Sequence, residues 1–354
     1  MAYDAVVAGG SFAGLVMATT LRGRVALVEK GEVGDGQTSA CGTTLDAIEK
    51  LGLEESIEEV HDEGVMHLRH GVVRFRLPYR FCTFDYRTLC RLLLERFDGE
   101  LVRAAVTGVR AEAGNTTLLT DVGELEGALA VDATGWRAVL GRSANPSFPW
   151  RERVTYGLEQ PATGWDDPGL HFYFDARVRP EGYGWSFPAG PVARAGVLSY
   201  VAPEGVRAST EKFIAGEGMR GDHYHGGYLT AGLRPAVAGS VFMVGDSAGH
   251  CLPLTGEGIR PAIFFAQQLA GLLNGVIEGR RTRFEARQAY IELQASHARK
   301  FRILRGAQTW LRGWPDPPLG WFFRTYADQG MLYRWLSRVY WDVAAPILPA
   351  IRVA

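Results

Sequence analysis

The alternation of apolar and polar positions predicts a strand, a tight turn, a helix and a second strand within the first thirty residues. Apolar side chains dominate 3–8, a glycine-rich turn follows, and apolar residues return over 15–21 and 25–28. Short apolar runs that end at glycines are typical of buried strands, and the longer run between them is long enough for a helix. The chain therefore opens with a compact strand-helix-strand unit.

The same kind of pattern continues along the chain. It predicts a helix over 87–97, strands over 118–120 and 128–131, and a short buried strand over 241–244 that leads into a glycine-rich loop and another helix. From 281–305 the pattern is helical and charged. Strands that alternate with helices indicate an α/β fold.

Length and composition describe a globular protein with roughly two domains. The chain has 354 residues, of which 47% are apolar and 22% charged, and this balance argues against disorder. Its net charge of -1 gives no electrostatic reason to expect a nucleic acid partner. The sequence shows neither a signal-like start nor a run of about 18 apolar residues. We therefore expect a cytoplasmic protein without a membrane span.

The cysteines and histidines predict no metal site. The four cysteines stand at 41, 82, 90 and 251. This spacing matches neither a zinc site nor a disulfide framework. His223 and His225 have a spacing that could serve a metal, but no third ligand accompanies them. We interpret their loop as structural.

The first turn has the features of a dinucleotide-binding loop. Residues 9–14 fit the pattern GxGxxG, with Ser11 at the second glycine. Gly9 permits the sharp turn, Gly14 lets the helix pack close to the strand, and the first amides of the helix face a pyrophosphate. Glu29 ends the second strand 20 residues after Gly9, where an acid can accept hydrogen bonds from a ribose. Together these features favour dinucleotide binding over an ordinary turn.

Two later motifs indicate which dinucleotide is bound. Asp132-Ala133-Thr134-Gly135 follows the middle strands, and Gly245-Asp246 follows the late one. In combination with the first turn, they resemble the fingerprint set of FAD-dependent oxidoreductases of the p-hydroxybenzoate hydroxylase class, over about residues 1–275. The resemblance implies that Asp246 binds the ribityl chain of FAD. It also implies that the helix start at 255–259 lies near the pyrimidine edge of the flavin, where its dipole favours negative charge.

The resemblance and the first turn together assign a set of residues to FAD. They are Gly9, Ser11, Phe12, Ala13, Gly14, Glu29, Lys30, Cys41, Gly42, Arg87, Asp132, Ala133, Gly135, Gly245, Asp246, Pro253, Gly256, Gly258 and Ile259. The sequence contains no second GxGxxG after a strand. NAD(P)H or another reductant is therefore expected to visit the protein rather than to occupy a nucleotide domain of its own.

Three shorter stretches resemble the geranylgeranyl reductase family. Residues 183–188 look like its YxWxFP motif, 254–259 match its glycine-rich run after GD, and 39–42 fall where those enzymes have a Cys-Gly beside the flavin. Ser11 and Thr43 replace glycines that are usual in the family. The resemblance implies transfer of a hydride from N5 of reduced FAD to a carbon-carbon double bond of a prenyl or other hydrophobic substrate, with a proton added at the other carbon.

The residues proposed for catalysis are Cys41, Tyr183 and Trp185. Tyr183 and Trp185 alternate along a strand and share one side of its sheet, where they form a slot for a flat apolar chain or serve as core aromatics. Cys41 is either a proton donor or gate, or an inert buried thiol. Arg87 either lies near the flavin or is a surface charge at a helix start.

Alternative functions remain open at this level. A flavin monooxygenase that hydroxylates or epoxidises a hydrophobic or aromatic molecule would share every FAD motif. A flavin halogenase needs a relay lysine, and the sequence has no lysine between 50 and 212. A protein with FAD in a purely structural role would hold a flavin that external reductants cannot turn over.

The predicted architecture is a doubly wound, Rossmann-like FAD-binding domain, a mixed-sheet substrate domain and a helical C-terminal cap. The FAD-binding domain takes residues 1–75, 100–145 and 235–280, the substrate domain 76–99 and 146–234, and the cap 281–354. Five of the nine tryptophans, including Trp314, follow residue 309, where basic groups outnumber acids. Such a cap could line a substrate tunnel and make peripheral contact with a membrane. The sequence predicts no oligomeric state.

Overall fold

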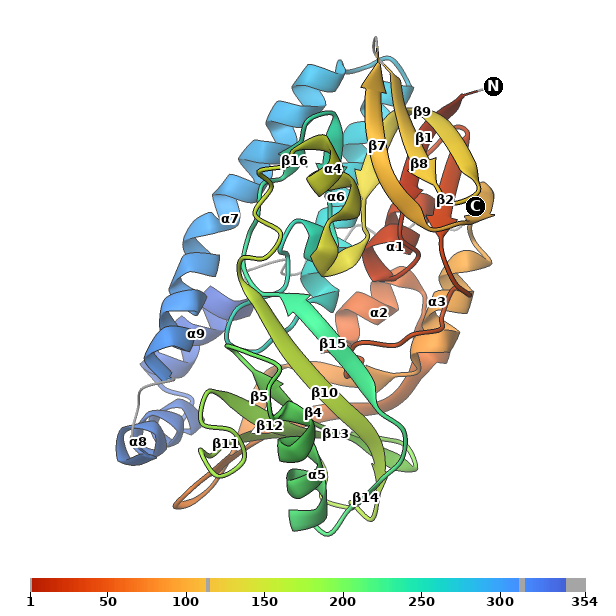
Figure 1. Ribbon diagram of the computed structural model, residues 1–354. Coiled ribbons are helices and arrows are strands. Elements are labelled where there is room, and N and C mark those ends of the chain that lie inside the picture. The colour runs from red at the N-terminus through yellow and green to blue at the C-terminus, as the bar shows by residue number, and fades with distance from the viewer. Residues whose placement is uncertain (1, 113–114, 312–315, 342–354) are drawn as a thin grey trace.

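The computed structural model describes residues 2–112, 115–311 and 316–341, and this part of the chain forms two sheets surrounded by helices (Figure 1). The first sheet has the strand order β16-β17-β9-β1-β2-β6, with β8 paired to β9 and β7 to β8. Its strands are β1 (Tyr3–Ala8), β2 (Val25–Glu29), β6 (Glu100–Arg103), β7 (Val106–Glu112), β8 (Asn115–Thr120), β9 (Gly123–Asp132), β16 (Val237–Ala238) and β17 (Val241–Met243).

The central strands of the first sheet run parallel. β1 pairs in parallel with β2 and β9, and β17 pairs in parallel with β9. Their carboxyl ends therefore meet at one edge of the sheet, which is where α/β proteins of this kind bind ligands.

Both faces of the first sheet are buried. Ala5 and Val7 of β1 belong to one apolar cluster, whereas Val6 and Ala8 belong to another on the opposite face. The first cluster lies under α1 (Phe12–Thr20), α2 (Leu45–Leu51), α3 (Tyr86–Leu94) and α6 (Ile259–Ile277). The second lies under α4 (Val139–Ala144). Because parallel strands buried on both faces read as continuous apolar runs, the sequence pattern located β1, β2 and β17.

The second sheet is mixed, as predicted. Its order is β14-β10-β13-β12-β11-β4-β5-β3, with β15 paired to β10, and only the pairing of β11 with β4 is parallel among the described strands. Its strands are β3 (Gly42–Thr44), β4 (Ile57–Leu68), β5 (Gly71–Phe84), β10 (Val154–Thr163), β11 (Leu170–Phe174), β12 (Gly182–Ala189), β13 (Val192–Ser199), β14 (Arg220–Gly221) and β15 (His225–Thr230). Helix α5 (Val206–Gly216) covers one face of this sheet.

The segments that build each sheet differ from the domain boundaries expected above. Residues 42–68, which fall in the segment 1–75, supply β3 and β4 to the second sheet. Both strands pair with β5, so the chain enters the second sheet at Gly42 rather than at residue 76.

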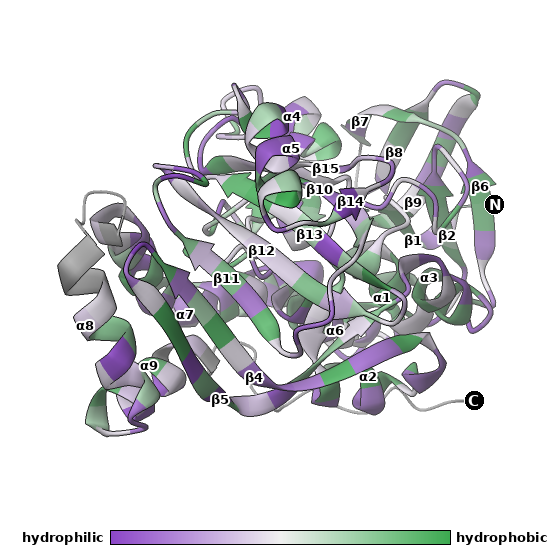
Figure 2. Cartoon of the chain, turned by 90° about the horizontal axis from the view of Figure 1, so that it is seen from below, coloured by the Kyte–Doolittle hydropathy of each residue, from purple (hydrophilic) through white to green (hydrophobic). Residues whose placement is uncertain are grey.

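The C-terminal region is helical, as predicted. Helix α7 (Arg283–Leu311) runs along one side of the molecule, and α8 (Asp316–Ala327) and α9 (Met331–Trp341) lie beside the hairpin of β4 and β5 (Figures 1 and 2). The expectations for 312–315, including Trp314, and for 342–354 lie outside the described residues. Within the described parts of the chain, no helix combines the length and the apolar character needed to cross a membrane.

Candidate active site

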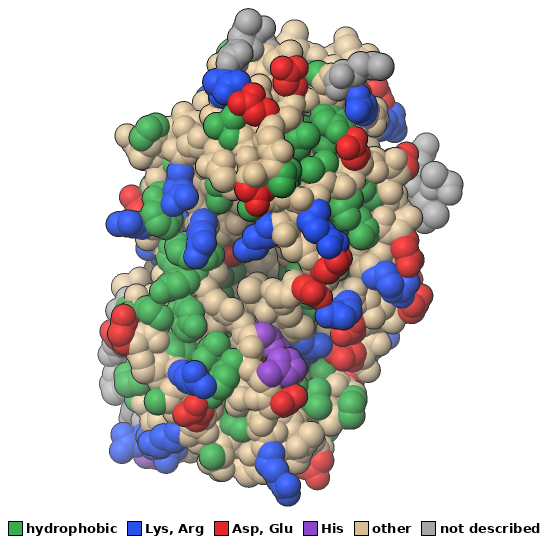
Figure 3. Space-filling view, turned by 45° about the vertical axis from the view of Figure 1, so that its right-hand side comes forward, with side chains coloured by type: hydrophobic (Ala, Val, Ile, Leu, Met, Phe, Trp, Pro, Cys, Tyr) green, Lys and Arg blue, Asp and Glu red, His purple; other side chains and the backbone are tan. Residues whose placement is uncertain are grey.

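A cavity of about 1430 Å³ lies between the two sheets and extends to the C-terminal helices. A pocket for one small ligand typically measures about 300–1,000 Å³, so this cavity has room for a dinucleotide and a second ligand. The surface is hollowed near the middle of one face, with charged side chains of both signs around the opening (Figure 3). One end of the cavity is lined by the glycine turn after β1, and the other by aromatic side chains of the second sheet, α8 and α9.

The glycine turn has the close backbone contacts that the sequence predicts. Gly9 has a φ of 105°, and a Cβ atom there would lie 2.3 Å from the carbonyl oxygen of Ala133. A Cβ atom at Gly14 would lie 1.7 Å from the carbonyl oxygen of Gly9, so only glycine lets α1 pack this close to β1. Glu29 Oε2 accepts a hydrogen bond from the amide of Gly10 at 2.6 Å, which fixes the carboxylate at the end of β2.

Most residues assigned to the cofactor line the cavity. Those that do are Gly9, Ser11, Phe12, Ala13, Glu29, Lys30, Gly42, Ala133, Gly135, Gly245, Asp246, Gly256, Gly258 and Ile259. Gly14 and Pro253 do not line it, although Gly14 shapes the turn from behind.

Asp132 does not line the cavity but forms hydrogen bonds with the turns that do. The side chain is fully buried, and its carboxylate accepts hydrogen bonds from the amide of Thr134 at 2.9 Å and the hydroxyl of Ser247 at 2.8 Å. It also accepts one from the amide of Gly141 at 2.8 Å. Asp132 therefore joins three turns at the edge of the sheet, and the direct contact with FAD that the resemblance implies is replaced by support from behind.

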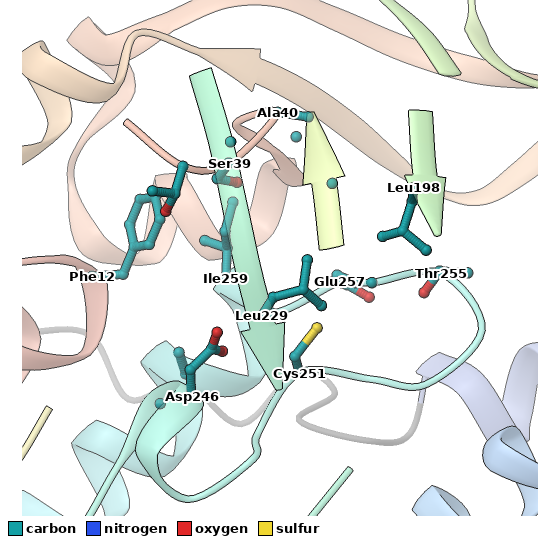
Figure 4. A pocket seen from close by; sticks show the side chains of 18 of the residues that line it. Phe12, Ser39, Ala40, Leu198, Leu229, Asp246, Cys251, Thr255, Glu257 and Ile259 are labelled. Carbon is teal, nitrogen blue, oxygen red and sulfur yellow. The ribbon is translucent and has the colours of Figure 1, made fainter. Parts of the chain in front are cut away.

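Asp246 points into the cavity from the turn after β17, as does Cys251 (Figure 4). Its Oδ2 accepts a hydrogen bond from the amide of Thr230 at 3.2 Å. Burial raises the pKa of this carboxyl to about 6, because the charged form loses its hydration, although the Thr230 amide and Arg234 favour that form. A partly buried carboxylate that faces a cavity suits a polyol ligand that donates hydrogen bonds.

Sequence reasoning missed the residues that hold this turn. Arg234 is buried, and its guanidinium donates to the carbonyl oxygens of Trp136, Trp150, Glu152 and Asp246. Its burial lowers its pKa to about 10. An isolated arginine before a short strand carries no motif, so only the fold shows that it ties four loops together.

His250 supports the same turn from the other side. Its Nδ1 accepts the amide hydrogen of Gly245 at 3.1 Å, which leaves Nε2 as a donor to Gln294 Oε1 at 3.2 Å. Burial lowers the pKa of His250 to about 3, so the ring is neutral at physiological pH. Gln294 on α7 also donates to the carbonyl oxygen of Arg234, and this links the long helix to the site.

Aromatic side chains of the second sheet form the apolar end of the cavity. Tyr183 and Trp185 of β12 face the cavity together, as their alternation predicts. The hydroxyl of Tyr183 donates to the carbonyl oxygen of Thr255, in the loop before α6. The other side chains that line this end include Phe172, Phe174, Phe187, Trp310, Phe322, Phe323, Tyr326 and Trp335.

The structure does not bring Cys41 or Arg87 to the cavity. Cys41 is fully buried with a φ of 51°, and its thiol donates to the carbonyl oxygen of Ser39 at 3.3 Å. Burial raises its pKa, which keeps the thiol protonated. Arg87 is 75% exposed and pairs with Asp35 at 2.6 Å. Cys251, which is not among the site residues expected from the sequence, lines the cavity.

The two histidines of the loop before β15 have different surroundings. His223 is 69% exposed and lies 3.1 Å from a carboxylate oxygen of Asp222. His225 is largely buried and contacts Glu159. Among the described residues, no group of three or more metal-ligating side chains includes either histidine.

Comparisons with known proteins agree with this geometry. A scan against models of known protein families finds no match. The chain is 27% identical over 329 residues to digeranylgeranylglycerophospholipid reductase 2 of Methanothermobacter thermautotrophicus, covering 81% of this chain and 83% of that protein.

Solved structures share the fold. A geranylgeranyl bacteriochlorophyll reductase-like protein from Thermoplasma acidophilum has a TM-score of 0.82 at 18% identity and covers 97% of each chain. An anhydrotetracycline hydroxylase from Streptomyces rimosus has a TM-score of 0.71 at 23% identity, over 98% of this chain and 78% of that one. A probable FAD-dependent monooxygenase from Pseudomonas aeruginosa has a TM-score of 0.64 at 18% identity, over 87% of this chain and all of that one.

These comparisons confirm the resemblance that the sequence motifs predict. The chain is similar to an enzyme of the geranylgeranyl reductase type, and its fold is that of FAD-dependent reductases and monooxygenases of the p-hydroxybenzoate hydroxylase class. The chain is therefore similar in sequence and fold to flavin-dependent oxidoreductases. The cavity fits the cofactor, since a glycine turn without room for a Cβ atom and a buried carboxylate both face it.

Proposed function

We propose that the protein reduces carbon-carbon double bonds in a prenyl chain or another long apolar substrate. The observation that supports this most directly is the continuity of the cavity, which joins the dinucleotide end to a long aromatic compartment. An aromatic compartment of this kind suits an apolar chain better than a compact polar molecule. The similarity to a digeranylgeranylglycerophospholipid reductase supports a lipid with prenyl chains as the substrate class.

The residues at the glycine end would hold FAD. Glu29 would accept hydrogen bonds from its ribose, Asp246 would bind its ribityl chain, and the amides at Gly256 and Gly258 would face the flavin. When bound and reduced, the flavin supplies a hydride to one carbon of the double bond. NAD(P)H or another two-electron donor of similar chemistry would reduce it between turnovers.

The protein's own contribution is to position the double bond and exclude water. Tyr183 and Trp185 would form one wall of the slot, and the bond from Tyr183 to the Thr255 carbonyl would hold that wall against the loop that faces the flavin. Residues Phe322 and Phe323 of α8 would close the slot on the side of the cap. A chain held between aromatic faces keeps few orientations, which raises the fraction of productive encounters.

We also propose that the cap contacts a lipid surface. Trp321 is 66% exposed, Met331 80% and Trp335 53%, and these side chains lie on α8 and α9 near several arginines. Trp335 also lines the cavity, so the apolar end of the cavity reaches this exposed surface. A lipid could then enter without leaving an apolar environment.

A flavin monooxygenase is the second candidate, and the fold similarity to an anhydrotetracycline hydroxylase over 98% of the chain favours it. One experiment separates the two. The purified flavoprotein is incubated with a chemical reductant or NAD(P)H and a panel of prenyl lipids, with and without oxygen. The masses of the products are then measured by mass spectrometry.

Gain of two hydrogen atoms per double bond without oxygen would support the reductase. Gain of one oxygen atom only when oxygen is present would overturn it in favour of the monooxygenase. The variant W185L should lower product formation strongly, because it removes one wall of the slot. W165L is the matched control, since Trp165 packs on the opposite face of the second sheet.

A further inference from the structure

Four residues form a row across four neighbouring strands of the second sheet. Trp185 of β12 is opposite Gly196 of β13, Gly196 is opposite Glu159 of β10, and Glu159 is opposite His225 of β15. Residues paired in this way lie on the same side of a sheet. The row faces the cavity, which both Trp185 and Glu159 line.

Gly196 leaves the space that lets the Trp185 side chain reach Glu159 across β13. A Cβ atom at this position would lie 2.4 Å from Cζ2 of Trp185 and 2.6 Å from Cβ of Glu159. Because glycine leaves that space empty, the indole reaches across β13 and its Nε1 donates to Glu159 Oε2 at 2.9 Å. The position of Glu159 relative to the slot is therefore fixed by an aromatic side chain of the slot itself.

Glu159 lies between the cavity and an imidazole. Its side chain is 2% exposed, and its Oε1 forms a short hydrogen bond with Nε2 of His225. His225 Nε2 also lies 3.1 Å from Gln37, and the His225 ring lies 5.7 Å from that of His223, which is exposed. The His225 side chain is 10% exposed, so a proton taken up from water at His225 would reach Glu159 without crossing the apolar slot.

A buried positive charge that interacts electrostatically with Glu159 forms its ion pair with another acid. Arg194 is buried on the same face of β13, and it pairs with Glu58 at 2.7 Å and donates to the carbonyl oxygen of Phe84. No described arginine or lysine forms an ion pair with Glu159. The carboxyl can therefore exchange a proton with His225 without breaking a salt bridge.

The other acids that line the cavity have different positions or partners. Glu29, Glu32 and Asp35 lie at the dinucleotide end, and Asp246 lies in the turn that would bind the ribityl chain. Glu257 is paired with Arg260 at 2.7 Å and accepts the hydroxyl hydrogen of Tyr340.

Nor do the hydroxyl of Tyr183 and the thiol of Cys251 offer a better acid beside Trp185. The hydroxyl hydrogen of Tyr183 is held by the carbonyl oxygen of Thr255, and burial raises the pKa of this phenol. Burial also raises the pKa of the Cys251 thiol. Glu159 is the cavity-lining acid that combines proximity to Trp185 with a route for protons from outside.

We propose that Glu159 is the acid that protonates the substrate and that His225 restores its proton. The inference rests on the proposed reductase function. One alkene carbon receives the hydride that the cofactor supplies, and the electron pair of the double bond takes the carboxyl proton at the other carbon. Glu159 is left as a carboxylate, takes a proton from the His225 imidazolium, and His225 takes one from water. The flavin is oxidised, the alkene is reduced, and charge and atoms balance.

The variant E159Q tests this role directly. Glutamine keeps an oxygen that accepts the Trp185 indole hydrogen but has no acidic proton, so a purely positioning role predicts normal activity. We expect anaerobic reduction of the prenyl substrate to fall by about 100-fold, the usual range for loss of a general acid. The affinity of the apoprotein for FAD, measured by quenching of flavin fluorescence, should stay unchanged.

Chemical rescue provides a second readout. The variant E159A should regain part of its activity when formate is added, because a small acid can occupy the vacated space. The same substitutions at Glu217, which lies on the opposite face of the sheet and accepts the Tyr173 hydroxyl hydrogen, should change neither the rate nor the response to formate.

The outcomes separate the two proposals. If the wild-type protein reduces no prenyl double bond, the proposed function fails. If it does reduce the substrate and E159Q works at the wild-type rate, Glu159 is not the acid and the inference is overturned. Loss of activity in E159Q together with formate rescue of E159A supports it.

Discussion

At the scale of single residues, the site contains groups whose burial is unfavourable in the protein alone. Asp246 is the clearest of these, because its partly buried carboxylate faces the cavity with one hydrogen bond from the Thr230 amide. A bound polyol would supply hydrogen bonds to that carboxylate in place of water. The residue therefore lowers the stability of the empty protein and raises its affinity for the cofactor.

We expect D246N to stabilise the apoprotein at neutral pH. The pKa of Asp246 is about 6 in the folded protein, whereas its ordinary value in an unfolded chain is 3.8. Between these values the folded state retains a proton that the unfolded state releases. The free energy of unfolding of the wild type therefore falls as pH rises from 3.8 to 6, by about 3 kcal/mol in total. Urea unfolding of both apoproteins at pH 4 and pH 8 measures the difference.

The free energies of unfolding of the wild type and D246N should differ at pH 8 and be nearly equal at pH 4. Equal stability at pH 8 would mean that Asp246 is hydrated in the empty site. D246N should also bind FAD more weakly, by about tenfold for the loss of one charge-assisted hydrogen bond.

The sequence motifs correctly predicted the glycine and the acidic residues that line the dinucleotide end of the cavity. Gly9, Glu29 and Asp246 line the cavity as expected, because their roles depend on local strand ends that the apolar pattern locates. The positions of Cys41 and Asp132 were not predictable in this way. Whether a side chain near a motif faces the cavity or the core depends on a φ angle or on partners more than a hundred residues away, as with Asp132 and Ser247.

At the scale of elements, the site depends on contacts between loops that no motif marks. The apolar pattern located α1 but placed its start at residue 15, whereas the helix begins at Phe12. The turn between β1 and α1 is therefore shorter than the apolar pattern predicts. Helix α3 similarly begins at Tyr86 and ends at Leu94, with Asp85 accepting the Thr88 amide hydrogen as its cap.

Arg234 is the strongest test of how these loops are held. Replacement by methionine would leave the carbonyl oxygens of Trp136, Trp150 and Glu152 without the buried guanidinium. We expect R234M to lower the free energy of unfolding by about 3 kcal/mol or more, since each hydrogen bond involves a charged donor. Thermal unfolding followed by circular dichroism measures this loss.

The matched control is R207M. Arg207 is 71% exposed and pairs with Glu211 on the surface of α5, where solvent screening leaves such pairs with little effect on stability. If R234M and R207M lose a similar amount of free energy of unfolding, the carbonyl groups around Arg234 form hydrogen bonds with water in R234M.

At the scale of the whole molecule, the cavity connects three parts of the fold. The first sheet, the second sheet and the C-terminal helices each contribute to its lining. The sequence predicted an aromatic C-terminal cap that lines a substrate tunnel, and aromatic side chains of α8 and α9 line the cavity. Strands β3 and β4 also joined the second sheet rather than the first, because strand pairing over long distances leaves no local signal.

We expect the exposed aromatic side chains of the cap to bind anionic liposomes. The double variant W321S/W335S should lower binding by at least about tenfold, because it removes two large apolar side chains from the proposed contact. Co-sedimentation with vesicles that contain phosphatidylglycerol measures this. F284S is the control, since Phe284 is 67% exposed at the other end of α7. Equal binding by all three proteins would exclude the cap as the contact surface.

The pairing of β17 with β9 also affects how the protein is made. Val241 pairs with Ala130, so this edge of β9 stays open while the intervening 110 residues are synthesised. At about 5–20 residues per second, a ribosome needs on the order of ten seconds for that stretch. During this time an apolar strand edge is exposed to other nascent chains. Slower growth at lower temperature, or a chaperone that covers this edge, should therefore improve the yield of folded protein, and fragments that end before β17 should aggregate.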